Sequence, residues 1–362
     1  MNTIALIAMQ GTESLAMEID YYLKRWRGTE ESFLLPSSLI RFNTGDAKAV
    51  LMESVRSKDV YIVSDPYNCS VSYNMRGICN QMSPDDHFQD VLRVISAISG
   101  KAISVSLLMN LLFGARQHGR YMRESLDCAM ALQILERSGI KNIITFDAHD
   151  PKVQNAIPLT SFDNLYPHYQ MIKSLIQNVS DIHLDPIHTV LVAPDAGGIQ
   201  RCLKMADCIG LEIGMFYKRR NLENVIDGEN KIMKHEYIGN SVVGKDIIIV
   251  DDILASGSSL MDSFKKLKTL GASRIFAFIT FGMFSDGYAN FDLAYEEGLF
   301  TKIFISNLTY HPIEGEERPY IVNVNMSKYA AYVIDCIHQG KSISTVLDPY
   351  NKIKTLLPIQ IN

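Results

Sequence analysis

The chain has 362 residues, 47% hydrophobic and 21% charged, which are ordinary proportions for a folded protein of roughly two domains. Thirty-five basic and forty acidic side chains give a net charge of −5, which excludes a nucleic-acid binder that relies on bulk positive charge. The longest apolar runs are strand-sized, so we expect no membrane span and no signal peptide. The six cysteines form no CxxC pair, which favours buried free thiols in a reducing cytoplasm.

Short apolar runs alternate with segments of helical period along the whole chain. In the first half we expect strands at Thr3–Met9, Val60–Ser64 and Asn142–Phe146, and helices at Glu13–Lys24, His87–Ile98 and Arg123–Ser138. In the second half we expect strands at Thr189–Ala193, Ile213–Tyr217, Ile247–Val250, Ile275–Thr280 and Ile303–Ser306, and helices at Ile199–Cys208, Gly257–Leu270 and Ser327–His338. This alternation predicts an α/β protein with parallel-rich sheets flanked by helices.

The sequence indicates domain boundaries less clearly than it indicates helices and strands. A stretch rich in Pro, Ser, Asp and Asn at 158–167 predicts a boundary between an N-terminal domain, 1–162, and a second domain, 163–326. Residues 327–347 are expected to pack back on the first domain, and 348–362 to form an extension. Two stretches are expected to be long loops, which are usually functional or mobile: Asp65–Asp86, with scattered Pro, Asn, Ser and Gly, and the polar Arg219–Asn240.

The strongest local signal follows the apolar run Ile247–Val250. Two carboxylates, Asp251 and Asp252, come directly after it, and a turn of small residues then opens a helix. The turn consists of Ser256, Gly257, Ser258 and Ser259. Backbone N–H groups at such a turn can bind a phosphate, and paired carboxylates can accept hydrogen bonds from neighbouring sugar hydroxyls. This pattern favours a ribose 5-phosphate site, although an acidic metal site or a simple helix cap would also explain it.

The segment 247–260 resembles the phosphoribosyl diphosphate-binding motif of type I phosphoribosyltransferases and of ribose-phosphate diphosphokinases. The second family fits better, because similar motifs follow in order along nearly the whole chain. They are Arg41–Asp46, Glu53–Val60, Ala115–Gln117, Thr145–His149, Asp163–Tyr166, Pro194–Gly198, Tyr217–Arg220, Gly244–Lys245 and Gly340–Ser344. The resemblance implies two phosphoribosyltransferase-like domains and transfer of the β,γ-diphosphate of ATP to ribose 5-phosphate, with phosphoribosyl diphosphate and AMP as products.

The resemblance also assigns residues to the ATP side of the site. It implies that Arg116 and Gln117 bind ATP, together with Phe42, Thr44 and Asp46 from a neighbouring subunit. Phe42 and Arg116 could enclose an adenine ring by stacking and by a cation–π contact. Taken alone, Phe42 would more simply be a core aromatic residue. Because a neighbour completes the site, we expect a homo-oligomer built from dimers, such as a hexamer.

The remaining expected site residues concern metal and charge. The resemblance implies that His149 and Asp195 hold Mg²⁺ with ATP, although imidazole is not the usual Mg²⁺ ligand. Lys218 and Arg220 lie where a strand enters the polar stretch 219–240. We expect them, with His149, to be the catalytic groups, since diphosphoryl transfer needs cations that neutralise developing charge. A solvated basic face is the simpler explanation for such a cluster.

Several positions depart from the family pattern. Ala255 stands where the family carries Asp, Thr44 replaces an Asp, and Asp46 replaces a Glu. Residues 118–121 and Phe281 also differ, and the chain is longer at 65–86 and beyond 347. These departures suggest a divergent member whose acceptor could be a larger ribose compound such as ADP-ribose. A phosphoribosyltransferase and a non-catalytic regulatory paralogue are the two other hypotheses.

Overall fold

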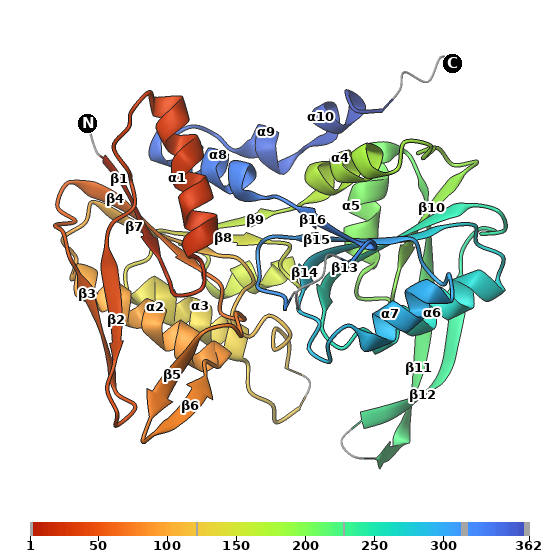
Figure 1. The fold of residues 1–362 in the computed structure, drawn as a ribbon, viewed down its shortest axis with the longest axis horizontal. Helices are drawn as coiled ribbons and strands as arrows, with labels where there is room; N and C mark the ends of the chain where they lie inside the picture. The colour runs from red at the N-terminus through yellow and green to blue at the C-terminus, as the bar shows by residue number, and fades with distance from the viewer. Residues whose placement is uncertain (1–2, 121, 227–228, 313–317, 358–362) are drawn as a thin grey trace. The chain divides into compact units, whose positions relative to one another are not determined.

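The computed structural model describes residues 3–120, 122–226, 229–312 and 318–357, with the backbone alone at 218–235. The chain divides into two compact units, each visible in Figure 1. The first contains Met1–Pro167, Asn307–His311 and Asn325–Leu347, and the second contains His168–Ser306, Pro312–Val324 and Asp348–Asn362. The boundary therefore follows Pro167 rather than residue 162, because strand β9 pairs with the first sheet.

The first unit is built on a five-stranded parallel sheet of order β1-β4-β7-β8-β9. Its strands are β1 (Thr3–Ala8), β4 (Lys58–Ser64), β7 (Ser104–Met109), β8 (Asn142–Phe146) and β9 (Ser161–Leu165). The helices are α1 (Glu13–Arg27), α2 (Pro84–Ile98), α3 (Asp127–Arg137), α8 (Ser327–His338) and α9 (Ser344–Leu347), with a 3₁₀ turn η1 (Pro151–Ala156). In Figure 1, α1 and α8 cover one face of the sheet, and α2 and α3 cover the other. Strands β4 and β8 are largely apolar, with the run Val60–Val63 in β4, because both of their faces are covered.

Two antiparallel hairpins project from this unit. They are β2 (Ser37–Arg41) with β3 (Ala47–Leu51), and β5 (Ser72–Met75) with β6 (Ile78–Gln81). The second hairpin corrects the expectation of a long loop at 65–86. Helix α2 also begins earlier than expected, at Pro84, because Ser83 and Asp86 form a capping box around its first turn.

The second unit is built on a seven-stranded sheet of order β12-β11-β10-β13-β14-β15-β16, parallel except for the β11–β12 pair. The strands are β10 (Thr189–Ala193), β11 (Glu212–Ile226), β12 (Glu229–Ile238), β13 (Asp246–Leu254), β14 (Ile275–Gly282), β15 (Lys302–Ser306) and β16 (Ile321–Val324). The helices are α4 (His168–Asn178), α5 (Ile199–Ile209), α6 (Ser258–Thr269), α7 (Ala289–Glu296) and α10 (Tyr350–Lys354). In Figure 1, α4 and α5 lie on one face of this sheet, and α6 and α7 lie on the other. The central strands β13 and β14 are almost wholly buried, which explains the apolar runs Ile247–Val250 and Ile275–Ile279 within them.

The polar stretch 219–240 is not a loop. Residues 212–226 and 229–238 form a long antiparallel ribbon at the edge of the second sheet, with shifts of register between Arg219 and Val225. A ribbon that extends beyond its covering helices can be polar on both faces, so its composition resembles that of a loop. The Asp227-Gly228 pair, a common hairpin dipeptide, was the sequence signal for these two strands.

The C-terminal part of the chain contributes to both units. Helix α8 packs on α1, where Arg27 Nη2 lies 2.6 Å from Asp335 Oδ1 and the Trp26 and Tyr332 rings are 6.1 Å apart. Residues beyond 347 belong to the second unit, since α10 packs on α4 and α5. Among the described residues, no helix has both the length and the apolar content that crossing a bilayer requires.

The cysteines agree only partly with their expected burial. None of the six, all of them described residues, is in a disulfide, and Cys128, Cys202 and Cys336 are buried. Burial raises the pKa of the Cys128 thiol to about 12, so this group is unreactive at neutral pH. Cys79, in contrast, is exposed on β6, because the segment expected to be a loop is a hairpin.

A buried carboxylate fixes residues 307–311 to the first unit. Asp65, which follows β4, is 2% exposed. Its Oδ2 accepts hydrogen bonds from Thr309 Oγ1 at 2.9 Å and from Tyr310 N at 3.2 Å, and its Oδ1 accepts one from Tyr67 N at 3.1 Å. Burial raises the pKa of Asp65 to about 6, although these hydrogen bonds act in the opposite direction.

Asp65 is expected to make the free energy of unfolding depend on pH. The unfolded chain releases the Asp65 proton near pH 4, whereas the folded chain keeps it until about pH 6. This contribution to the free energy of unfolding therefore falls by up to about 3 kcal/mol as the pH rises from 4 to 6, and is constant above that range. Urea unfolding of Asp65→Asn should lack this decrease, while the exposed control Asp262→Asn should keep it. Equal pH dependence in both variants would contradict the assignment.

Candidate functional site

The turn between β13 and α6 has a backbone that only glycine fits. Gly257 has φ +81°, and a Cβ atom at this position would lie 2.2 Å from Cζ of the fully buried Phe291. Gly257 was expected as the first residue of the helix, but it is the N-cap residue of α6, which begins at Ser258 and has no side-chain cap. The Ser256 and Ser258 hydroxyl oxygens are 3.4 Å apart at the same turn. The start of α6 therefore offers backbone N–H groups and hydroxyls to an anion.

Two carboxylates lie beside this turn and share one arginine. Asp251 and Asp252 are inside β13 rather than after it, because the strand continues to Leu254. Asp252 is buried and lies 3.3 Å from Arg201 Nη2, whereas Asp251 lies 3.9 Å from Arg201 Nη1 and keeps 30% of its side chain exposed. Burial and then the neighbouring Asp252 carboxylate raise the pKa of Asp251 well above its usual range, while Arg201 lowers it. Hydrogen-bond donors on a ligand would favour the charged form of Asp251.

Arg201 was missed by sequence reasoning. It lies on the buried face of α5, with Cys202, Met205 and Ala206, and is 8% exposed. A charged residue on the apolar stripe of a helix needs a partner in the core. That exception to the helical pattern was the available signal for a buried carboxylate nearby.

Asp195 lies at the same edge of the second sheet. Strands β10 and β13 are parallel neighbours, so their carboxyl ends meet there. Asp195 follows β10 and is exposed, and its Oδ1 accepts a hydrogen bond from Gly198 N at 3.1 Å. It also contributes to the raised pKa of Asp251, after burial, Asp252 and Arg201. The second unit therefore brings together Asp195, Asp251, Asp252 and the turn 256–259.

The first unit brings Arg116, Gln117 and His149 to the carboxyl edge of its own sheet, since β7 and β8 are parallel neighbours. All three side chains are exposed. His149 comes two residues after Asp147, a buried residue with φ +40° that turns the chain away from β8. Its ring lies 5.2 Å from that of His118.

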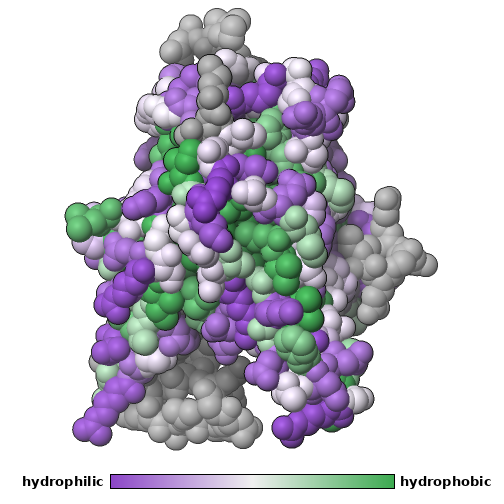
Figure 2. All heavy atoms as spheres, turned by 90° about the vertical axis from the view of Figure 1, so that its left-hand side faces the viewer, coloured by the Kyte–Doolittle hydropathy of each residue, from purple (hydrophilic) through white to green (hydrophobic). Residues whose placement is uncertain are grey.

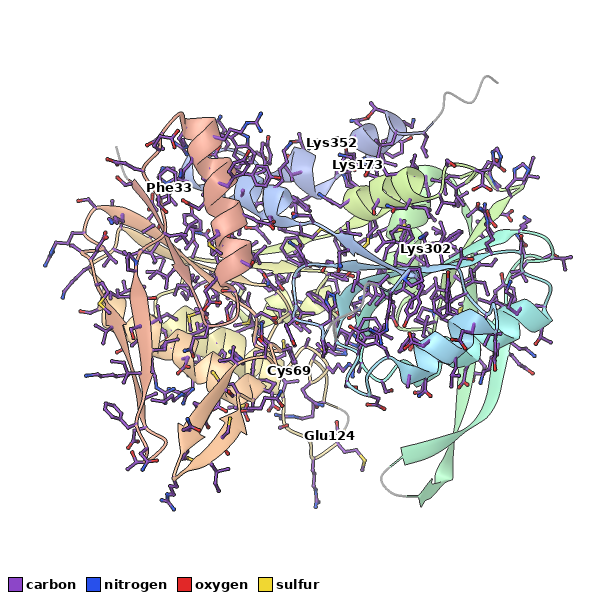
Figure 3. All side chains as sticks on the ribbon, in the orientation of Figure 1. Phe33, Cys69, Glu124, Lys173, Lys302 and Lys352 are labelled. Carbon is purple, nitrogen blue, oxygen red and sulfur yellow. The ribbon has the colours of Figure 1, made fainter. Side chains whose placement is uncertain are left out.

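His118 connects the segment 118–121, which departs from the family pattern, with the residues next to His149. Its Nδ1 lies 3.1 Å from Asp150 Oδ2. Glu124, labelled in Figure 3, lies further along this segment, which continues to α3. The replacement of the family's usual residues at 118–121 therefore changes the surroundings of a candidate site residue.

Phe42 lies at the turn of the β2–β3 hairpin and is 45% exposed, so the alternative of a core aromatic residue is wrong. Phe42 N donates to Asp46 O at 2.8 Å, and Thr44 Oγ1 donates to Asp46 Oδ2 at 2.9 Å. In the described part of the chain, no ring or charge contact joins Phe42 to Arg116.

Lys218, Arg219 and Arg220 have backbones within β11, where Lys218 pairs with His235 across the ribbon. Their side chains lie outside the described residues. The roles expected for Lys218 and Arg220 therefore depend on the sequence alone.

Comparison with known proteins identifies the class and then the family. A model of the phosphoribosyl transferase domain matches residues 161–285, and a model of the N-terminal domain of ribose phosphate pyrophosphokinase matches residues 4–139. The second unit therefore contains a phosphoribosyltransferase-type domain. Because the two models together match well over half of the chain, in this order, the chain belongs to the ribose-phosphate pyrophosphokinase family.

Curated relatives and a solved structure agree with this assignment. Ribose-phosphate pyrophosphokinase A of Dictyostelium discoideum is 26% identical over 308 residues, 84% of this chain and 88% of that protein. The ribose-phosphate pyrophosphokinase of Staphylococcus aureus is 24% identical over 350 residues, 96% and 98% of the two chains. The crystal structure of phosphoribosylpyrophosphate synthetase from Mycobacterium smegmatis has the same fold, with a TM-score of 0.73 at 18% identity, covering 93% of this chain and 99% of that one.

Proposed function

We propose that this chain is a ribose-phosphate diphosphokinase, which transfers the β,γ-diphosphate of ATP to the anomeric hydroxyl of ribose 5-phosphate. The products are phosphoribosyl diphosphate and AMP. Membership of the family and its curated relatives support this activity. The observation that carries the proposal is the turn at Gly257, because an uncapped helix start lies beside two strand-end carboxylates. Phosphate and vicinal hydroxyls, which ribose 5-phosphate combines, match those two groups.

The second unit supplies the acceptor site. Backbone N–H groups at 257–259, with the hydroxyls of Ser256, Ser258 and Ser259, bind the 5-phosphate. Asp251 accepts hydrogen bonds from the ribose hydroxyls, since it is the more exposed carboxylate of the pair. Asp252 is held by Arg201 and fixes the end of the strand. Ala255 supplies no charge where the family carries Asp, so these groups bind the sugar without it.

We propose that residues of the first unit bind ATP. Arg116 and Gln117 contact the nucleotide from the edge of the sheet, and the exposed Phe42 ring, with Thr44 and Asp46, completes the adenine site of a neighbouring subunit. A homo-oligomer built from dimers, such as a hexamer, is therefore part of the proposal. Figure 2 shows one side of the molecule, on which several groups of apolar side chains are exposed between hydrophilic ones. Exposed apolar area of this kind suits contact between protein chains.

Mg²⁺ is the proposed metal, and the residues present fit it. Asp195 offers carboxylate oxygen at the edge of the second sheet, and His149 is assigned to the Mg·ATP side by the family motif. Across the described residues, no three His, Cys, Asp or Glu side chains converge as a metal site. That agrees with an ion held by one or two carboxylates and by substrate phosphates. When bound, Mg²⁺ would neutralise phosphate charge.

The catalytic step is assigned to cations of this chain. Lys218 and Arg220 neutralise charge on the diphosphoryl group while it moves from AMP to the sugar oxygen. The chemistry otherwise depends on alignment of the anomeric hydroxyl with the β-phosphorus. We propose the reducing cytoplasm as the compartment of this activity, which suits six cysteines present as thiols.

AMP formation from ATP, Mg²⁺ and ribose 5-phosphate, with no nucleobase present, tests this function. We expect AMP in amounts equal to the sugar consumed. AMP release with ADP-ribose alone would move the acceptor to a larger ribose compound. Consumption of phosphoribosyl diphosphate by added bases would indicate a phosphoribosyltransferase. Nucleotide binding without turnover on any acceptor would indicate a regulatory paralogue.

A further inference from the structure

We propose that the β5–β6 hairpin is a brace that fixes the Phe42 turn of the β2–β3 hairpin in the orientation that serves the nucleotide. The brace consists of Tyr73, Met75 and Arg76 on the β5–β6 hairpin, and it holds Arg41 and Asn43, the two neighbours of Phe42. This inference rests on the proposed function, because it concerns the same ATP site. Arg41, Asn43 and Tyr73 would be positioning residues that need not touch ATP.

The first contact holds Arg41, the last residue of β2. Its side chain is only 10% exposed, and its Nη2 lies 2.9 Å from Asp90 Oδ2. Its guanidinium carbon lies 4.6 Å from the centre of the Tyr73 ring, a cation–π distance. The Tyr73 hydroxyl donates a hydrogen bond to Asp86 Oδ1 at 3.4 Å. Arg41 is thus fixed between helix α2 and strand β5, one residue before Phe42.

The second contact joins the tips of the two hairpins. Arg76 N donates to Asn43 Oδ1 at 2.7 Å and to Asn43 O at 3.1 Å. A Cβ atom on Gly45 would lie 2.7 Å from Met75 Sδ, so the glycine allows the Met75 side chain to pack against this turn. Phe42 is therefore followed, as well as preceded, by a residue that the β5–β6 hairpin holds.

The brace itself has a defined geometry. Arg76 and Gly77 both have positive φ, +54° and +80°, which is the combination of a tight two-residue hairpin turn. At its base, Met82 N donates to Val71 O at 2.9 Å, and Gln81 Nε2 donates to the carbonyl oxygen of Cys69, labelled in Figure 3. A two-stranded hairpin alone is marginally stable in water. Mutual support of the two hairpins lowers the entropy that the Phe42 turn loses when a nucleotide binds.

The double variant Asn43→Ala/Tyr73→Leu tests the brace without leaving a buried charge unpaired. We expect its KM for ATP to rise about tenfold, because side-chain contacts on both sides of Phe42 are lost. Its KM for ribose 5-phosphate should change less than about twofold, since that site is in the other unit. Asn74→Ala is the matched control, because Asn74 is exposed on the same strand as Tyr73. An unchanged KM for ATP in the double variant, or an equal rise in the control, would overturn the brace.

Amide hydrogen exchange makes the test independent of activity. Phe42 N and Gly45 N donate within the turn, to Asp46 O and Phe42 O. We expect both amides to exchange about tenfold faster in the double variant than in Asn74→Ala and the unmodified chain. Faster exchange in a chain that forms no AMP would support the brace and refute the proposed function. Unchanged exchange would refute the brace even if AMP forms.

Discussion

Replacing Lys218 with alanine is expected to lower kcat for AMP formation about 10²–10³-fold, by analogy with the loss of one preorganised charge-stabilising donor. The affinity for ribose 5-phosphate should stay within about twofold, because we propose that the turn at 256–259, and not Lys218, binds that ligand. Steady-state kinetics gives kcat, and calorimetric titration with ribose 5-phosphate gives the affinity.

The matched control for Lys218→Ala is Lys265→Ala. Lys265 is exposed on α6 and belongs to the same unit, so its loss removes an equal charge away from the site. It should leave kcat unchanged. Equal loss of turnover and of ribose 5-phosphate binding in Lys218→Ala would show that Lys218 helps to hold the acceptor instead of stabilising the transferred group.

Gly257→Ala is expected to disrupt the turn at 256–259, which we propose binds ribose 5-phosphate, and to destabilise the second unit. A positive φ costs a residue with a Cβ atom about 1–2 kcal/mol, and the overlap with Phe291 adds about 1–3 kcal/mol of overpacking. The free energy of unfolding should therefore fall by about 2–5 kcal/mol, and affinity for ribose 5-phosphate should fall with it. Urea unfolding and calorimetric titration measure the two effects.

Gly210→Ala separates backbone strain from the overlap. Gly210 also has positive φ, +72°, but a Cβ atom there would meet nothing within 4 Å. This control should lose only the strain of about 1–2 kcal/mol and bind ribose 5-phosphate normally. If both variants lose the same stability, the contact of Gly257 with Phe291 does not determine the shape of the turn.

The buried strands could be predicted from the sequence because burial on both faces leaves a continuous apolar run. Asn142–Phe146 and Thr189–Ala193 are confirmed with the same bounds, and helix Ser327–His338 is as well. The ribbons could not be predicted in this way. Residues of β5–β6 and β11–β12 lie outside the covered parts of the sheets, so polarity there indicates exposure and not the absence of strands.

The candidate site, too, could be predicted from the sequence only in part. A strand-end carboxylate pair and a small-residue turn are local features, so Asp251, Asp252 and Gly257 could be found from spacing. Arg201 comes from another helix, and its partnership with Asp252 depends on tertiary packing. The bracing of the Phe42 turn likewise depends on contacts between hairpins some thirty residues apart, which no local pattern reveals.

The fate of the two terminal phosphates of ATP tests the central claim most directly. ATP labelled with ³²P separately at the β and γ positions is incubated with Mg²⁺ and ribose 5-phosphate, and the sugar product and nucleotides are separated. Transfer of an intact diphosphate predicts that both labels move to the sugar in equal amounts, with unlabelled AMP as the only nucleotide product. Movement of the γ label alone, with formation of ADP, or retention of both labels on the nucleotide would contradict it.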